Sequence, residues 1–333
     1  EYVVVHNAVP GGLEKTVVER LEMDPTKIKN LKLTGKITTE DYTFMRSKMT
    51  SLQRLNLKEV ESVVDGVYKI PSGAFYNKKT LMKCVLPDRL ERIEENAFYG
   101  TVLTGSVVLP EGLKYVSGFR ETKITSVQFP STLEVIGNSA FDRCSSLMCE
   151  INLPESIKLI EDSAFNSTGI KGNLSLPHNL ESIGSSAFHG CRNLTGSLVI
   201  PDKVKTINNS AFGYCGFTGT LTLPDGLTEI QRSAFSLTSF KGELNIPSSV
   251  TIIGAYAFEM TKFSGTLVLP SELVSLGERV FYNCSRLSGV IEIPENILAI
   301  PSRLFDGCSK LEGIKLHKDV EVIESQAFYN CTS

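Results

Sequence analysis

A phenylalanine recurs along most of this 333-residue chain, with 21 to 24 residues between neighbours. A proline repeats with the same spacing. A period of 20 to 29 residues with ordered leucines indicates a solenoid, in which coils stack along one axis. Because a solenoid grows by adding coils, the length does not imply several globular domains. The phenylalanines are Phe75, Phe98, Phe119, Phe141, Phe165, Phe188, Phe212, Phe235, Phe258, Phe281, Phe305 and Phe328, and the prolines are Pro87, Pro110, Pro130, Pro154, Pro177, Pro201, Pro224, Pro247, Pro270 and Pro294.

The unit that runs from Leu198 to Leu221 shows how one coil is expected to fold. Leu198 and Ile200 alternate with Val199, as in a strand with one buried face. Pro201 ends that strand because it has no N–H for the ladder. Phe212, which follows an alanine, is expected to fill the core. One unit has about eight inward apolar groups, too few to offset the ordering of 23 residues, so it needs neighbouring coils.

We expect two parts: a capping segment over residues 1–60 and a solenoid over residues 61–333. The solenoid is expected to be curved, either α/β or mostly β, with about 11–12 coils of ~23 residues. The cap is expected to be a small α/β segment that covers the core of the first coil. Its predicted elements are a helix over Glu14–Leu21 with Leu13, Val17, Val18 and Leu21 on one face, a strand over Ile28–Leu33, a helix opened by the capping box Thr38–Asp41, and a strand over Leu52–Leu57.

The bulk composition excludes some classes of function. The net charge is −3 with a pI near 5.9, and no basic stripe of the kind that binds nucleic acid is present. No apolar run approaches the ~18 residues of a membrane span. The chain starts at Glu1 without methionine, so we expect any signal or anchor segment to have been removed. It stops at Ser333 before an expected strand, which indicates either a truncated end or an array without a separate cap.

The cysteines repeat with the phenylalanines, which favours a packing role. We expect a buried ladder of small apolar side chains that needs no disulfide. Cys84 takes an inward strand position, and Cys149 lies outside these positions. If a disulfide forms, Cys144 and Cys149 are the remaining candidates. There is no Cys-x-x-Cys pair, so no zinc site is expected. Six cysteines follow a repeat phenylalanine by three positions: Cys144, Cys191, Cys215, Cys284, Cys308 and Cys331.

The histidines and carboxylates do not form a catalytic pattern. His6, His178, His189 and His317 are scattered over different units. His189 near Cys191 is the nearest approach to a nucleophile and base, but Cys191 has a core position. We therefore expect no catalytic residue, no metal ligand and no cofactor.

The most informative surface is the row of side chains two positions before each proline. These residues are expected to point outward from the strands and to be small, polar or β-branched. They could simply suit a solvated sheet, or they could form a broad, shallow face that binds proteins. No aromatic residue is in the row, and the chain has no tryptophan, so we expect modest affinity or multivalent binding. The candidate binding face is Gln128, Asn152, Ser175, Val199, Thr222, Asn245, Val268 and Glu292.

The repeat resembles the BspA-like leucine-rich repeats, also called the Treponema pallidum type. The best-matching stretches are PSTLEVIGNSAFDRCSSL from Pro130, PHNLESIGSSAFHGCRNL from Pro177 and PSSVTIIGAYAF from Pro247. Residues 27–57 also look like the segment before such repeats in secreted Bacteroides-type proteins. The pattern departs at Gly118, Val280 and Leu304, which replace the usual alanine, and at His317, which replaces a proline. The resemblance implies a non-catalytic cell-surface or secreted protein that binds host proteins, other bacteria or matrix components.

Three functions follow as hypotheses. The first is an adhesion and protein-interaction module whose partners are host matrix or surface proteins, or other bacterial cells. The second is a structural spacer that presents another domain. The third is a carbohydrate-binding accessory protein, which a cluster of exposed tyrosines would support. The tyrosines Tyr115, Tyr214, Tyr256 and Tyr282 occupy different repeat positions, so we do not expect their side chains to converge. An enzyme is a remote fourth possibility, which a deep pocket with two carboxylates or a metal would revive.

Overall fold

The fold is a β-solenoid of about 13 turns of ~23 residues with little helix, which confirms the solenoid prediction. The computed structural model describes residues 1–332, and the predicted end at Ser333 lies outside the described residues. The chain divides into two compact units, Glu1–Ile157 (unit 1) and Lys158–Ser333 (unit 2).

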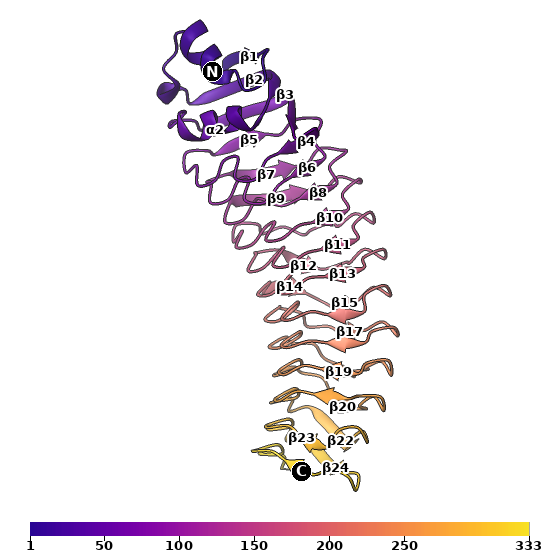
Figure 1. Cartoon of the computed structure of the whole chain (residues 1–333). Helices are drawn as coiled ribbons and strands as arrows, with labels where there is room; N and C mark the ends of the chain where they lie inside the picture. Colours follow the sequence, from indigo (N-terminus) through magenta and orange to yellow (C-terminus); the bar gives the residue numbers. More distant parts are fainter. Residues whose placement is uncertain (333) are drawn as a thin grey trace. The chain divides into compact units, whose positions relative to one another are not determined.

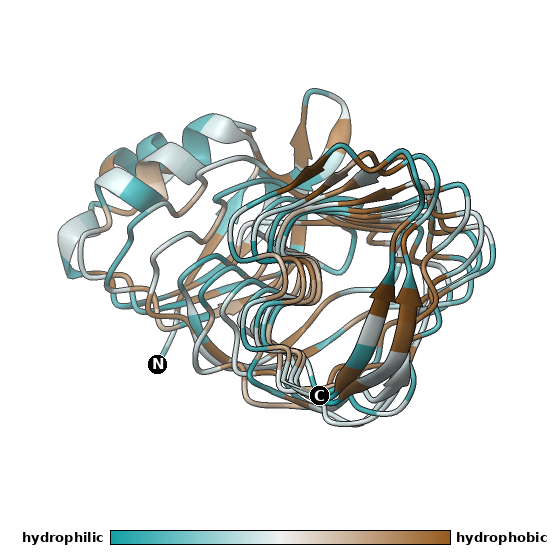
Figure 2. Cartoon of the chain, turned by 90° about the horizontal axis from the view of Figure 1, so that it is seen from below, coloured by the Kyte–Doolittle hydropathy of each residue, from teal (hydrophilic) through white to brown (hydrophobic). Residues whose placement is uncertain are grey.

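Unit 1 begins with a parallel sheet that carries helices on one side (Figures 1 and 2). The sheet strands pair in the order β1, β2, β3, β5. The first strand, β1, was not predicted from the sequence. The elements are β1 (Val3–Asn7), α1 (Leu13–Lys15), η1 (Thr16–Arg20), η2 (Pro25–Lys27), β2 (Asn30–Ile37), α2 (Thr39–Ser47), β3 (Arg54–Val64) and β5 (Lys83–Val85).

The first predicted helix is correct in place but wrong in part of its buried face. Leu13 and Val17 are buried, whereas Val18 and Leu21 are 42% and 45% exposed. The reason is that residues 16–20 form a π-helix, in which the N–H of Leu21 bonds the carbonyl of Thr16. A π-turn has more residues than an α-turn, so side chains beyond it rotate off the α-helical stripe.

The capping box at the start of α2 is confirmed. The Asp41 carboxylate accepts a hydrogen bond from the N–H of Thr38 at 3.0 Å. The same carboxylate accepts from Gly11 N at 2.8 Å and Leu13 N at 2.9 Å. Asp41 is 1% exposed. One side chain therefore holds the starts of both helices of the N-terminal segment.

Strand β3 runs through the boundary that we expected near residue 60. It pairs with β2 from Arg54 to Ser62, on both sides of that point. It then turns at Asp65 and Gly66 into β4 (Val67–Ile70), with which it is antiparallel. The separation into a cap over residues 1–60 and a solenoid over residues 61–333 remains a proposal.

Each coil has strands at up to two places, one before the repeat proline and one before the repeat phenylalanine. We call them pre-proline and pre-turn strands. In unit 1 the pre-turn strands form a parallel ladder from β4 through β6 (Arg92–Ile93) and β8 (Tyr115–Val116) to β10 (Val135–Ile136). The pre-proline strands β7 (Thr104–Val108) and β9 (Lys123–Gln128) pair with each other. The pre-turn strands are short, so the sequence pattern did not reveal them.

Unit 2 repeats the arrangement (Figure 1). Its pre-turn strands are β11 (Leu159–Ile160), β13 (Ser182–Ile183), β16 (Thr206–Ile207), β18 (Glu229–Ile230), β19 (Ile252–Ile253), β21 (Ser275–Leu276), β23 (Ala299–Ile300) and β25 (Val322–Ile323). The strands on the pre-proline side are β12 (Lys171–Asn173), β14 (Asn193–Thr195), β15 (Leu198–Val199), β17 (Leu221–Thr222), β20 (Gly265–Thr266), β22 (Leu287–Glu292) and β24 (Leu311–Lys315). All pairs among them are parallel.

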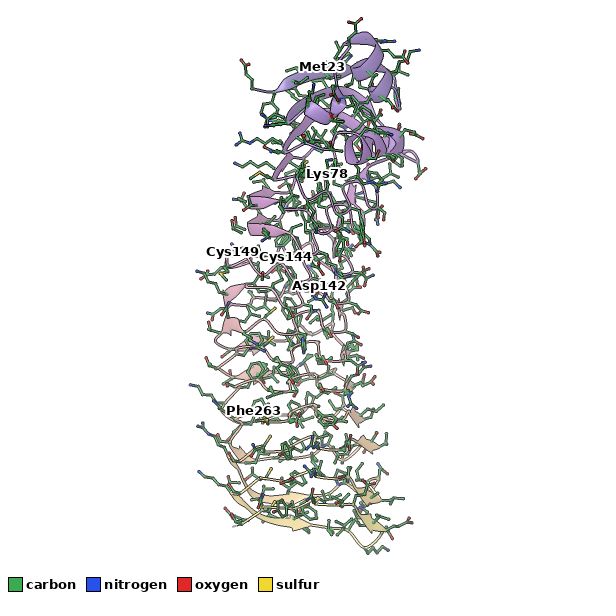
Figure 3. The ribbon with its side chains drawn as sticks, turned by 90° about the vertical axis from the view of Figure 1, so that its left-hand side faces the viewer. Met23, Lys78, Asp142, Cys144, Cys149 and Phe263 are labelled. Carbon is green, nitrogen blue, oxygen red and sulfur yellow. The ribbon has the colours of Figure 1, made fainter. Side chains whose placement is uncertain are left out.

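The repeat phenylalanines fill the core of unit 2, as predicted, and their rings stack in a column. The rings of Phe212 and Phe235 lie 5.7 Å apart and 3° from parallel. Phe217 and Phe240 begin a second column at 5.0 Å, which Phe263 continues (Figure 3). Because each ring packs on the ring of the next coil, the core needs neighbouring coils to form.

The phenylalanine turn has a left-handed residue on each side in most coils. Around Phe212 these are Ser210 with φ of 54° and Tyr214 with φ of 59°. The turn bonds the next coil through Phe212 N to Ala234 O at 2.9 Å and through Tyr214 N to Ser236 O at 2.8 Å. Small polar residues and glycine suit such a conformation, so a tyrosine there has a backbone cost.

Candidate functional site

All eight residues of the candidate binding face are exposed. The strand alternation explains this, because Val199 points outward between the buried Leu198 and Ile200. Gln128 and Asn152 belong to unit 1. The other six, Ser175, Val199, Thr222, Asn245, Val268 and Glu292, belong to unit 2.

The face is not one continuous sheet. Gln128, Val199, Thr222 and Glu292 are in strands, and the other four are in segments without a strand. Val199 lies beside Thr222 in the ladder, and Glu292 beside Lys315. Because the proline that ends each strand has no N–H, the ladders remain short.

Two of the face residues line one hollow in unit 2, which we call the Val199 hollow. It has a volume of about 470 Å³. Ser175 and Val199 contribute exposed side chains, and Leu176 and Ile200 contribute buried ones. His178 and Asp202 also line it. The hollow thus combines an apolar floor with neutral and charged polar groups. Its full lining is Asn173, Leu174, Ser175, Leu176, His178, Ser197, Val199, Ile200, Pro201 and Asp202.

A second hollow of about 530 Å³ in unit 2 is acidic. Glu272, Glu292 and Glu295 line it, together with Ile293. Glu292 also forms an ion pair with Lys315 at 2.7 Å. Both of these side chains are exposed, so the pair contributes little to stability.

The prediction that the tyrosines do not converge is wrong for two of them. Arg279 lies over Tyr282 at 4.6 Å and over Tyr256 at 5.7 Å, and Arg232 lies over Tyr256 at 4.6 Å. Tyr256 precedes its phenylalanine by two positions and Tyr282 follows its own by one. These positions meet because the turns of consecutive coils are hydrogen-bonded to each other, as from Met260 N to Tyr282 O at 2.8 Å.

The other two tyrosines have local partners. Tyr214 is near His189, with ring centroids 5.1 Å apart. Tyr115 in unit 1 is 9% exposed. Arg92 covers its ring at 4.0 Å and is held by Glu94 at 2.8 Å. Cation–π stacking of this kind orders the arginine as well as the ring.

The repeat cysteines form hydrogen bonds to the core backbone. Cys144, Cys191, Cys215, Cys284 and Cys308 are buried, as predicted, whereas Cys331 is half-buried. Each thiol donates to the carbonyl of the phenylalanine in the preceding coil, at distances such as 3.0 Å from Cys144 to Phe119 and 3.1 Å from Cys308 to Phe281. Burial raises the pKa of Cys144 and of Cys284 to about 11.

Threonine takes the same position in other coils, which the sequence reading missed. Thr238 donates to Phe235 O at 2.8 Å and Thr261 to Phe258 O at 2.8 Å. The signal was present, since these threonines also follow a repeat phenylalanine by three positions. The position therefore selects a small side chain with a donor. The remaining members are Thr101, Thr122 and Thr168.

The candidate disulfide between Cys144 and Cys149 does not form in this structure. All eight cysteines are free thiols. Cys144 is buried and Cys149 is half-buried (Figure 3). The Cys144 thiol is buried and donates a hydrogen bond to the Phe119 carbonyl, so its sulfur points into the core.

No catalytic pair forms at His189 and Cys191. The Cys191 thiol donates to Phe165 O at 3.2 Å, whereas His189 Nδ1 lies 3.3 Å from Asn166 Oδ1. Burial and the nearby Arg192 lower the pKa of His189. Across residues 1–332, no group of three or more His, Cys, Asp or Glu side chains could hold a metal ion. No helix in the same residues has the length and apolar character needed to cross a membrane.

The comparisons with known proteins concern the repeat. The BspA type leucine rich repeat region matches in six copies over residues 39–118, 68–195, 117–241, 171–288 and 239–333. No curated protein matches. A leucine-rich repeat protein from Bacteroides ovatus is similar in structure, with 26% identity over 80% of this chain and 68% of that chain and a TM-score of 0.57.

Two further solved structures are similar at lower scores. The Treponema pallidum leucine rich repeat protein has 22% identity over 52% of this chain and 80% of its own, with a TM-score of 0.39. A leucine rich cell surface protein from Faecalibacterium prausnitzii has 20% identity over 85% of this chain and 83% of its own, with a TM-score of 0.44.

Proposed function

The chain belongs to the BspA-type leucine-rich repeat family, whose repeats are of the protein-interaction type, and from this premise we propose that it is a non-catalytic adhesion module. Its place is the cell surface or the extracellular space. Its partners are host matrix or surface proteins, or the surfaces of other bacterial cells. The candidate binding face makes the contact.

The Val199 hollow is the observation in unit 2 that supports this proposal most strongly. Ser175 and Val199 converge on it, so two of the candidate residues form one concave surface rather than isolated exposed positions. Val199 is 60% exposed above the buried Ile200, and burial of such a side chain under a partner would stabilise a complex. His178 and Asp202 supply polar groups that would orient the partner.

The face has no aromatic anchor, which bears on affinity. Interface hot spots favour tryptophan, tyrosine and arginine. A face of small and β-branched residues would bind one partner molecule weakly and would gain strength from many copies displayed together. A monomeric affinity in the micromolar range fits this composition.

The carbohydrate hypothesis has less support. Sugar platforms use aromatic rings with an open face. The ring of Tyr256 lies between the guanidinium groups of Arg232 and Arg279, which come from the coils on either side of it. Among residues 1–332, no contact favours the spacer hypothesis over binding.

The test is a binding screen of the purified chain against immobilised matrix glycoproteins, with a glycan array in parallel. We expect saturable binding to a matrix protein that Val199→Asp weakens at least about tenfold. The matched control is Val274→Asp, because Val274 is 59% exposed in the same unit but is not in the candidate face. It should change the affinity less than about twofold.

The other outcomes select the other hypotheses. Binding to glycans alone would replace the adhesion proposal with carbohydrate binding. Unchanged binding in Val199→Asp would place the contact outside the candidate face. Equal loss of binding in both variants would show that the effect is not specific to the face and would contradict the proposal. No binding in either screen would favour the spacer.

A further inference from the structure

Unit 1 contains a pocket between strands β5 and β7 that the proposed binding face does not use. We call it the β5–β7 pocket. Its volume is about 190 Å³. Buried Phe98, Leu103 and Phe119 line its inner end, and exposed Lys83 and Ser106 line its outer end. The complete lining is Lys83, Cys84, Val85, Leu86, Phe98, Leu103, Thr104, Gly105, Ser106, Val107 and Phe119.

Missing side-chain volume is the first cause of this pocket. Cys84 and Val107 occupy the inward position of the pre-proline strand in two consecutive coils. In unit 2 the larger leucine or isoleucine takes that position, and the buried members are Leu174, Leu198, Leu221, Leu244, Leu267 and Ile291. A smaller side chain at a core position leaves a cavity unless the surroundings collapse.

The backbone prevents this collapse. β5 pairs with β3, and β7 pairs with β9. The bond from Thr104 N to Met82 O at 3.1 Å joins the starts of β5 and β7, but among the described strands no ladder continues between them. The pairing of β7 with β9 shifts register between Gly105 and Ser106, and Gly105 has a φ of +85°. A bulge with a left-handed glycine bends its strand. The bend lies in the wall of the pocket. The path of the backbone therefore forms the pocket, which does not depend on the rotamer of one side chain.

The lining defines the chemistry of a ligand. Phe98 and Phe119 stack at 5.1 Å and present an apolar surface. Lys83 is the one cationic side chain in the lining, and no carboxylate is among the lining residues. The volume is somewhat larger than the ~150 Å³ of an apolar cavity that admits benzene.

We propose that the β5–β7 pocket binds a small amphiphilic carboxylate, with an apolar body about the size of a benzene ring against Phe98 and Phe119 and its carboxylate beside Lys83. The burial of the apolar body supplies most of the affinity. The exposed ion pair adds orientation and a smaller contribution.

The experiment is a titration of the full chain with 4-fluorobenzoate, followed by ¹⁹F NMR. The native chain should bind it with a millimolar or lower dissociation constant. Cys84→Leu restores the side chain of the other coils and should weaken binding at least about tenfold, because it fills the space. Lys83→Gln should weaken the binding of the carboxylate about threefold and leave the binding of 4-fluorobenzyl alcohol unchanged.

Two further variants keep the result interpretable. Val107→Leu fills the pocket from its other strand, and it decides the question if Cys84→Leu does not fold. Cys149→Leu is the matched control, since Cys149 is also a half-buried thiol of unit 1 but does not line the pocket. It should bind like the native chain. The proposal is overturned if the native chain shows no binding at millimolar probe, or if folded Cys84→Leu and Val107→Leu bind as tightly as the native chain.

Discussion

The ammonium group of Lys78 donates a hydrogen bond to the backbone carbonyl of Met49 at 2.7 Å, and a second one to Arg46 O at 3.2 Å. These carbonyls lie at the end of α2, where helices leave acceptors without partners. Lys78 follows Phe75 by three positions, so it occupies the first place in the column that cysteine and threonine fill in later coils. It thereby connects the N-terminal helix to the first phenylalanine turn.

This contact predicts a pH dependence of stability. Burial lowers the pKa of Lys78 from 10.5 to about 8. Between these pH values the unfolded chain binds more protons than the folded chain. The contribution of Lys78 therefore makes the free energy of unfolding rise with pH across this window. Below about pH 8 the full cost of burying the charge is present. From pH 7.5 to 9.5 we expect a gain on the order of 1–2 kcal/mol in urea unfolding. Lys78→Met should lack this gain, and an equal gain in that variant would refute the assignment.

The phenylalanine column predicts a large effect of Phe212→Ala. The ring is fully buried between Phe188 and Phe235, so its removal leaves a cavity that the neighbouring coils cannot close. We expect a loss of about 3–5 kcal/mol in the free energy of unfolding, measured by denaturant titration. Tyr329→Ala, at an exposed position beside the last repeat phenylalanine, is the comparison and should cost less than about 1 kcal/mol. An unchanged unfolding midpoint for Phe212→Ala would contradict the packing described above.

In the cysteine and threonine column, we expect a hydrogen-bond donor to contribute more to stability than the sulfur atom itself. Cys308→Thr replaces the thiol, which donates to Phe281 O, by a hydroxyl that can donate to Phe305 O of its own coil, as Thr238 donates to Phe235 O. This substitution should cost no more than about 1 kcal/mol. Cys308→Val has nearly the same shape without a donor, and it should unfold about 1–2 kcal/mol more easily than the threonine variant. Thermal melts of the two variants make the comparison. Equal melting temperatures would show that the position selects only for size.

Burial predicts which thiols react. The pKa of Cys84 is raised to about 12 and that of Cys284 to about 11, and the thiolate is the reactive form. At pH 8 we expect iodoacetamide to modify Cys149 first and the buried repeat cysteines only after unfolding. Mass spectrometry of the alkylated peptides measures this order. Early labelling of Cys284 in the folded chain would mean that its coil opens readily.

Asp41 predicts a local effect at the N-terminal end. Asp41→Ala removes the acceptor for three backbone N–H groups, and the expected cost is about 2–4 kcal/mol. Amide hydrogen exchange should accelerate at Gly11 and Leu13. Glu14→Ala is the control, because that carboxylate is exposed at the first of these helices. Unchanged exchange at Leu13 in Asp41→Ala would show that the carboxylate does not hold the two helix starts.

The sequence alone determined the repeat and everything that depends on its spacing. The alternation around Val199 predicted its exposure, the recurrence of Phe212 and its equivalents predicted the stacked core, and Thr38 with Asp41 predicted a capping box. These features are local, because each depends on residues within one coil or one helical turn.

The tertiary structure decided what depends on the register between coils. It brought Tyr256 and Tyr282 to the same arginine, made threonine and cysteine equivalent in one column, and paired the short pre-turn strands in ladders. It also left a pocket beside Cys84, because β5 and β7 pair with other strands. A side-chain pattern along one coil does not specify these features, since they arise from backbone hydrogen bonds between residues more than twenty positions apart.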